Sequence, residues 1–210
     1  MNPLATNSTS SLAKTNKQIA VPITIMARLR EETALEHRAV EKAFNLKSAM
    51  NMGGYQSLLL SLYGIYAPFE DVLRGMDLPI SMDGRWKTEW LMKDLEHFKI
   101  GRIAIDRTGK AKPSLPPLET WEQILGSLYV LEGSTLGGQF IYKALQKRLP
   151  VNAERGARFF AGYGQQTHLK WAEFGQEVCA IARLNKLYQE QVVDAARDMF
   201  VFVGKRLAKR

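Results

Sequence analysis

His37 stands out because a basic and an acidic residue share its face of a predicted helix. Arg30 lies seven residues before it and Glu41 four residues after it, and these spacings place all three side chains on one face. A carboxylate one turn away can orient an imidazole that binds a metal ion, and a guanidinium two turns away can hold an anionic ligand group. A histidine in such a helix also serves purely structural roles, so both interpretations stay open.

Four glycines gather in the segment 125–140, LGSLYVLEGSTLGGQF. Gly126, Gly133 and Gly137 are seven and four residues apart, which stacks them on one helix face, and Gly138 adjoins them. Each glycine inside a helix costs about 1 kcal/mol relative to alanine, so the four together forgo roughly 4 kcal/mol. The bare backbone can offset this cost by admitting either a closely packed helix or a flat ligand that lies across the glycines.

Helical periodicity surrounds both features. Steps of three and four residues mark one face of the segment 24–44, at Leu29, Thr33, His37, Val40 and Phe44. This pattern predicts one amphipathic helix with Thr24 as its N-terminal cap. Further helices are predicted over 55–74, with a kink at Pro68, and over 85–98, 118–149 and 152–163.

The remaining segments complete an all-α prediction. Residues 167–204 are predicted to be helical in several pieces, and residues 99–118, rich in Gly and Pro, are predicted to be a loop. The chain has no βαβ alternation, internal repeat or heptad array. We therefore expect about seven helices in a single-domain bundle, in which the glycine-rich helix is kinked.

Length and composition exclude several classes of protein. A chain of 210 residues with 46% apolar residues can bury a sizeable core without covalent staples. The single cysteine, Cys179, cannot form an intrachain disulfide or a cysteine-rich metal site, which fits a reducing compartment. The longest apolar stretch, residues 58–67, is far shorter than the roughly 18 residues of a membrane-spanning helix. We expect a soluble, cytoplasmic protein that has no membrane partner.

The charge of the chain is concentrated near its ends. Residues 1–22 contain no continuous apolar run and are predicted to be a disordered leader, and residues 205–210 are predicted to be a basic tail. Six of the 29 basic residues lie in these two segments, so the predicted domain, residues 23–204, carries 23 basic and 21 acidic residues. This near balance argues against a nucleic-acid groove, although the net charge of the whole chain is +8.

Two segments resemble the proximal and distal helices of haem oxygenases, in particular the bacterial group that produces biliverdin. They are LREETALEHRAVEKAF at 29–44 and YVLEGSTLGGQFIYKAL at 129–145, and the resemblance extends over residues 25–204. It implies that His37 is the proximal ligand of haem iron and that Glu41 is its partner. It further implies that Arg30 pairs with a haem propionate, for which Lys170 is a second candidate.

The resemblance also implies the distal side of the site. Gly133, Gly137 and Gly138 would form a kinked helix against the other face of the haem, where backbone groups can contact bound dioxygen. Mammalian-type members have an aspartate after the first of these glycines, whereas this chain has Ser134. A hydroxyl can join a water network but supplies no negative charge.

The implied activity is cleavage of haem to biliverdin, carbon monoxide and ferrous iron, with haem as both substrate and cofactor. It requires dioxygen and an electron donor such as ferredoxin or a flavin-dependent reductase. Two alternatives remain. One is a haem-binding sensor or carrier on the same fold without turnover, and the other is a related helical fold that binds no haem.

Overall fold

The computed structural model describes residues 24–101, 114–184 and 188–209, and its elements are helices without a strand in these ranges. The eight α-helices are α1 Ile25–Glu32, α2 Ala34–Phe44, α3 Met52–Leu73, α4 Thr88–His97, α6 Trp121–Gln146, α7 Arg158–Ala161, α8 Thr167–Leu184 and α9 Gln189–Ala208. Two 3₁₀ helices are η1 Leu46–Met50 and η2 Gly164–Gln166. The all-α prediction is confirmed, whereas the predicted leader 1–22 lies outside the described residues, as do residues 102–113 of the predicted loop.

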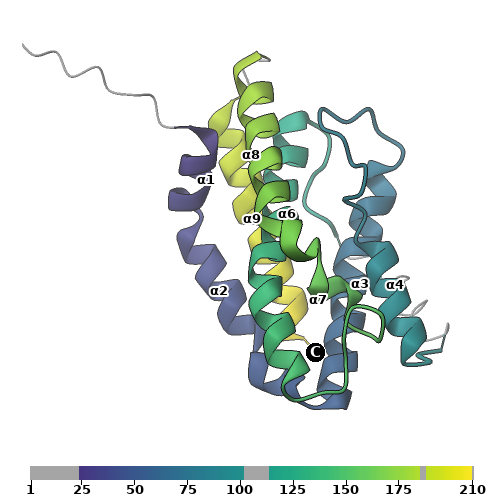
Figure 1. The fold of residues 1–210 in the computed structure, drawn as a ribbon. Coiled ribbons are helices and arrows are strands. Elements are labelled where there is room, and N and C mark those ends of the chain that lie inside the picture. The colour runs from purple at the N-terminus through teal and green to yellow at the C-terminus, as the bar shows by residue number, and fades with distance from the viewer. Residues whose placement is uncertain (1–23, 102–113, 185–187, 210) are drawn as a thin grey trace, which may run out of the picture.

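The helices form one bundle around α6 and α9. Figure 1 shows α1 and α2 along one side of the bundle, α6, α8 and α9 in the middle, and α3 with α4 on the other side. Helix α9 packs against both α2 and α6. The largest fully buried side chains include Tyr55, Tyr66, Phe69 and Phe174, which come from α3 and α8. No helix in the described ranges combines the length and the apolar character that crossing a membrane requires.

The predicted helix 24–44 is two helices that meet at Thr33. Its N-terminal cap is as predicted, because the Thr24 hydroxyl accepts a hydrogen bond from the Ala27 amide at 3.2 Å. The break has a tertiary cause. The guanidinium of Arg197 in α9 donates two hydrogen bonds, at 3.3 and 3.2 Å, to the Glu32 carbonyl, which a continuous helix would use for its own backbone. The Thr33 hydroxyl itself donates to the Leu29 carbonyl at 2.6 Å.

Helix α3 begins three residues before the predicted start and stays helical through Pro68. A proline has no amide hydrogen, so the carbonyl four residues earlier, that of Gly64, lacks its usual partner in the helix. The guanidinium of Arg206 from α9 donates to this buried carbonyl at 3.5 Å. Helix α9 ends at Ala208, four residues beyond the predicted domain end at residue 204. Lys205 and Arg206, which were predicted to be part of a basic tail, belong to its last turn.

The predicted helix 152–163 is wrong for most of its length, because only Arg158–Ala161 is helical. Gly156 and Gly162, which flank this turn, have φ of 76° and 53°, values outside the range of a right-handed helix. The turn itself is held by Asp94 of α4, whose carboxylate accepts the amides of Arg158 at 2.6 Å and Phe159 at 2.9 Å.

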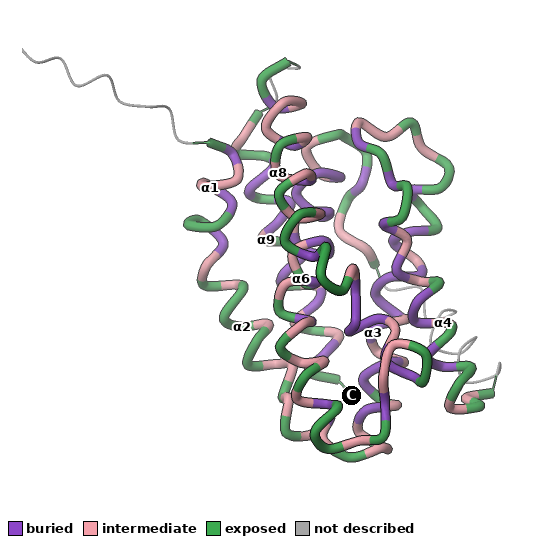
Figure 2. The backbone as a smooth tube through the Cα atoms, viewed as in Figure 1, coloured by how far each residue is buried: buried purple, intermediate pink, exposed green. Residues whose placement is uncertain are grey.

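Helix α4 is shorter than predicted by three residues at its start and one at its end, and α6 is shorter by three residues at each end. Helix α6 opens with a capping box between Thr120 and Gln123 and remains one helix through all its glycines. Helix α2 differs from the others because none of its residues is buried, as Figure 2 shows along its length. A helix with no buried residue leaves space on its inner side.

Candidate functional site

A cavity of about 950 Å³ lies between α2, α6 and α9. This volume is near the upper end of the roughly 300–1,000 Å³ that is usual for small-molecule and cofactor pockets. Most of its wall is apolar, with contributions from Phe44, Leu62, Ile65, Phe159, Phe200 and Val203. The cavity can therefore take a large, flat and mostly apolar ligand.

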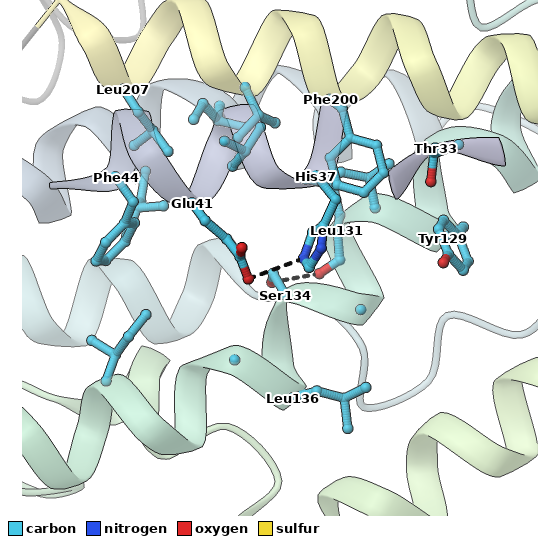
Figure 3. Close-up of a pocket in the computed structure, with 18 of the residues that line it drawn as sticks. Thr33, His37, Glu41, Phe44, Tyr129, Leu131, Ser134, Leu136, Phe200 and Leu207 are labelled. Atoms are coloured by element: carbon cyan, nitrogen blue, oxygen red, sulfur yellow. Dashed lines mark hydrogen bonds and ion pairs between the residues drawn. The ribbon is translucent and has the colours of Figure 1, made fainter. Parts of the chain in front are cut away.

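The imidazole of His37 stands in this cavity. Figure 3 shows His37 and Glu41 extending from α2 into the cavity, which Ser134 borders from α6. The His37 side chain is 57% exposed, and its Nε2 lies 3.9 Å from Oε1 of Glu41. Phe200 of α9 contacts the imidazole edge-on, with 5.5 Å between the ring centroids. The side chain is thus oriented by the nearby Glu41 carboxylate and one aromatic contact, and its ring is open to a ligand.

The glycines of α6 do not share one role, although their spacing suggested one face. A Cβ at Gly126 would lie 2.3 Å from the Val192 carbonyl oxygen of α9, so this glycine permits close helix packing. A Cβ at Gly137 would meet no atom within 4 Å, and Gly137 lines the cavity. Close helix packing therefore accounts for Gly126, whereas Gly137 leaves its backbone open to the cavity, and a flat ligand across it stays a prediction. Gly133 also lines the cavity, and a Cβ there would lie 3.4 Å from the indole of Trp171.

Two hydroxyl groups meet at the cavity wall between these glycines. The Ser134 hydroxyl donates to the Leu131 carbonyl at 2.7 Å, and its oxygen lies 2.8 Å from the hydroxyl of Tyr66 in α3. Tyr66 also reaches the Leu131 carbonyl at 3.2 Å. Burial raises the pKa of Tyr66 well above its usual value, although the bond with Ser134 acts in the opposite direction. Tyr66 therefore stays protonated at neutral pH and can donate a hydrogen bond.

Comparison with known proteins identifies the family of the chain. The family model described as Heme oxygenase matches residues 23–208. The chain belongs to the heme oxygenase family. No curated protein matches its sequence.

Three solved structures show how far the heme oxygenase fold is shared. The heme oxygenase of Leptospira interrogans is 19% identical, covers 89% of this chain and 100% of its own, and has a TM-score of 0.69. Heme oxygenase 2 of Chlamydomonas reinhardtii, solved without heme, is 14% identical, with 88% and 96% coverage and a TM-score of 0.66. Heme oxygenase-1 of the cyanobacterium Synechocystis, solved in complex with heme, is 22% identical, with 89% and 92% coverage and a TM-score of 0.63. At these identities the likeness shows the fold.

The structure brings most of the residues predicted for the site of this heme oxygenase family member to the cavity, but not all. Arg30, His37 and Glu41 line it from α1 and α2, and Gly133, Ser134 and Gly137 line it from α6. Gly138 does not, because it is buried, and a Cβ there would lie 3.7 Å from the Phe160 carbonyl. Lys170 is also absent from the wall, and its ammonium pairs with Glu173 of the same helix at 2.9 Å.

The sequence reasoning did not single out Arg38 and Tyr66, two polar residues of the wall. Arg38 lines the cavity beside His37 and forms no ion pair with the described residues. Arg38 is adjacent to His37 in sequence and therefore lies about 100° around the helix from it. Side chains that share a helix face are three or four residues apart, so this spacing did not place Arg38 beside His37. Tyr66 was missed because it is 68 residues from Ser134 in sequence, and only the fold brings them together.

Proposed function

We propose that this protein cleaves haem oxidatively to biliverdin, carbon monoxide and ferrous iron, with haem as substrate and cofactor. One observation carries the proposal: an exposed imidazole, that of His37, shares a 950 Å³ cavity with the bare backbone at Gly137. His37 would hold the iron of a flat porphyrin from one wall, and the open backbone at Gly137 would leave room for a small ligand at the other. Membership of the heme oxygenase family supports the same activity.

The residues around the cavity fit haem in shape and in charge. His37 would bind the iron, with Glu41 as the partner of the imidazole, and the apolar wall would contact the porphyrin ring. Haem carries two propionates, and Arg30 and Arg38 are the two guanidinium groups on the cavity wall. When bound, haem supplies the iron that activates dioxygen and the ring carbon that is oxidised.

The residues of α6 and α3 would control the reacting side. Gly137 leaves open space at this wall, and Gly133 admits the Trp171 indole beside it, so that backbone and a small ligand would share the side of a bound haem that faces α6. The hydroxyl pair of Ser134 and Tyr66 offers protons and acceptors at the same wall. Because Tyr66 stays protonated, it can hold a proton for a water molecule ordered by Ser134.

An external reductant must supply the electrons of this reaction. Ferredoxin and a flavin-dependent reductase are the two kinds of donor that we propose. The exposed guanidinium groups of Arg30 and Arg38 near the cavity favour an acidic donor protein. Turnover with ferredoxin should then slow as the ionic strength rises, and turnover indifferent to salt would contradict this part of the proposal.

The decisive experiment is a haem titration followed by reduction. The purified protein is titrated with ferric haem until a Soret band saturates, and ascorbate or a reductase system is then added in air. The expected result is loss of the Soret band, absorption of biliverdin and release of carbon monoxide. A stable Soret band without biliverdin would identify a haem-binding sensor or carrier, and no Soret band would overturn the proposal.

A further inference from the structure

A buried ionic cluster surrounds Glu132 of α6, the residue that precedes Gly133. We call it the Glu132 clamp, and it consists of Glu132, Arg85, Lys87 and Tyr163. Oε1 of Glu132 accepts from Arg85 at 2.9 Å and from the Tyr163 hydroxyl at 2.6 Å, and Oε2 forms a short bond with the Lys87 ammonium. Glu132, Lys87 and Arg85 are only 2%, 3% and 6% exposed. None of the four lines the cavity.

The clamp keeps its carboxylate charged in spite of its burial. Burial opposes the charge of Glu132, but the ammonium of Lys87, the hydrogen bond from Tyr163 and the guanidinium of Arg85 outweigh it and lower the pKa of Glu132. Buried ion pairs are seldom worth more than the apolar side chains that could replace them. Their hydrogen bonds are directional, however, and they fix the position of one element relative to another. A role in positioning therefore explains the cluster better than stability does.

The clamp ties α6 to two other segments of the bundle and, through one of them, to α8 and α3. Arg85 and Lys87 lie in the segment between α3 and α4, and Tyr163 lies between α7 and η2. Arg85 also reaches Glu177 of α8 at 3.4 Å. The Lys87 amide donates to Glu70 of α3 at 2.7 Å. A rotation or translation of α6 at Glu132 would strain its bonds to Arg85, Lys87 and Tyr163 at once.

Because a helix is rigid over a few residues, fixing Glu132 also fixes the direction in which the neighbouring residues of α6 face the cavity. With about 100° per residue, Gly133 lies at ~100° from Glu132, Gly137 at ~140° and Ser134 at ~200°. These three residues, which border the cavity, thus lie ~100° or more around α6 from the clamp. Since Gly137 has no side chain and the Ser134 hydroxyl bonds to the neutral groups of Leu131 and Tyr66, the clamp provides the ionic anchor of this stretch.

From these relations we infer that Glu132 is a positioning residue, which sets how Gly133, Ser134 and Gly137 face the ligand side of the cavity. The inference rests on the proposed function, because it concerns the distance between α6 and a haem held by His37. Weakening the clamp should let α6 rotate or shift. This should change the binding of a small ligand on the α6 side of the iron more than it changes the binding of haem.

The test uses ferric haem complexes of the full chain and cyanide as the probe of the α6 side. The variants are Glu132→Gln, which removes the charge and keeps the shape, and Tyr163→Phe, which removes one hydrogen bond. The matched control is Tyr55→Phe. Its hydroxyl is buried and donates to the Gly156 carbonyl at 2.7 Å, and Tyr55 lies on α3 outside the cavity wall. The haem Kd, the spectrum of the His37 complex and the cyanide Kd are measured for each protein.

The expected result is a cyanide Kd changed by about threefold or more in Glu132→Gln and in the same direction in Tyr163→Phe, because sub-ångström to ångström shifts alter positioned contacts many-fold. The haem Kd and the Tyr55→Phe control should stay close to the parent protein. An unchanged cyanide Kd in both variants would overturn the inference, as would an equal change in the control. If Glu132→Gln fails to fold, Tyr163→Phe decides alone. Absence of a Soret band in the parent protein would instead overturn the proposed function, and this inference with it.

Discussion

The hydroxyl oxygens of Tyr66 and Ser134 lie 2.8 Å apart at the wall of the cavity, and both groups reach the carbonyl of Leu131. One carbonyl thus fixes the positions of two proton donors from different helices. A serine at this place cannot provide the charge of an aspartate, but a buried tyrosine beside it supplies a second hydroxyl. The pair gives α6 and α3 a shared polar point in a mostly apolar wall.

Replacing Tyr66 by Phe should separate haem binding from turnover. Loss of the buried hydrogen bond should lower the free energy of unfolding by about 1 kcal/mol. Haem should bind with unchanged affinity, whereas biliverdin formation should slow by about tenfold, less than the ~100-fold or more expected for loss of a direct general acid. Single-turnover absorption measurements would check this. Full activity in Tyr66→Phe would show that its hydroxyl is not used.

Replacing His37 by Ala should remove the axial ligand and leave the cavity otherwise intact. We expect the Soret band to shift and the haem Kd to rise on the order of 100-fold, more than the usual effect of losing a ligand's partner. Added imidazole should restore the parent spectrum, because the side chain it replaces is exposed to the cavity. His168→Ala, at an exposed position of α8, is the control. A parent-like spectrum in His37→Ala would place the ligand elsewhere.

Alanine at two glycines of α6 should have opposite effects. In Gly126→Ala the new Cβ would overlap the Val192 carbonyl, so the free energy of unfolding should fall by about 1–3 kcal/mol. Gly137→Ala meets no neighbour and should raise it by up to ~1 kcal/mol through helix propensity. Haem affinity should nevertheless fall by about tenfold in Gly137→Ala, as expected for a clash worth 1–3 kcal/mol. Urea unfolding and haem titration measure both quantities, and unaltered haem affinity would mean that the ligand does not approach Gly137.

Removing Arg30 and Arg38 together should weaken haem binding without unfolding the protein. Each exposed guanidinium contributes roughly 0.2–1 kcal/mol to an ion pair, so the double alanine variant should raise the haem Kd about three- to tenfold. The difference should shrink at high ionic strength, since salt screens exposed charges. Arg148→Ala, an exposed site beyond the end of α6 and outside the cavity wall, serves as control. A double variant that binds haem like the parent at low salt would exclude these residues as propionate partners.

Asp94 should make the protein less stable as the pH rises from about 4 to 6. Burial raises the pKa of Asp94 to about 6, from 3.8, against the opposing effect of the amides of Phe159 and Arg158. Between these values the folded protein binds the proton and the unfolded chain has released it, so unfolding becomes easier with increasing pH. The free energy of unfolding should fall by about 3 kcal/mol over this range, because the pKa values of the folded and unfolded states differ by about two units and each unit corresponds to about 1.4 kcal/mol.

The measurement for Asp94 is urea unfolding at several pH values, compared with Asp94→Asn. The asparagine variant should be less stable overall because its amide cannot accept both backbone donors. It should lack the decline between pH 4 and 6. Parallel pH profiles for the two proteins would show that Asp94 titrates normally in the folded state.

Features set by neighbouring residues can be predicted from the sequence, whereas features set by contacts between distant segments cannot. The Thr24 cap, the helical fold and the pairing of His37 with Glu41 follow from residues within a turn of one another, and the structure contains all three. The break at Thr33 depends on Arg197, which is 165 residues from Glu32. A local pattern of apolar residues cannot report a competing donor from another helix, so the sequence predicted one helix there.

The cavity residues divide in the same way. His37 and Gly137 were found because their types are unusual for their helical positions, whereas Tyr66 resembles any other buried aromatic residue of α3. The sequence also could not separate the roles of the glycines. Gly126 and Gly137 have identical side chains, and only the position of Val192 opposite one and empty space opposite the other distinguishes them.

Arg206, in the C-terminal turn of α9, supplies the hydrogen-bond donor that the Gly64 carbonyl of α3 lacks. Truncation after residue 204, or a bulky fusion that unwinds this turn, would leave a dehydrated peptide oxygen in the middle of a helix that carries Leu62, Ile65 and Tyr66 into the cavity. Affinity tags are therefore better placed at the N-terminus, and proteolytic trimming of the last few residues should impair the pocket from a distance.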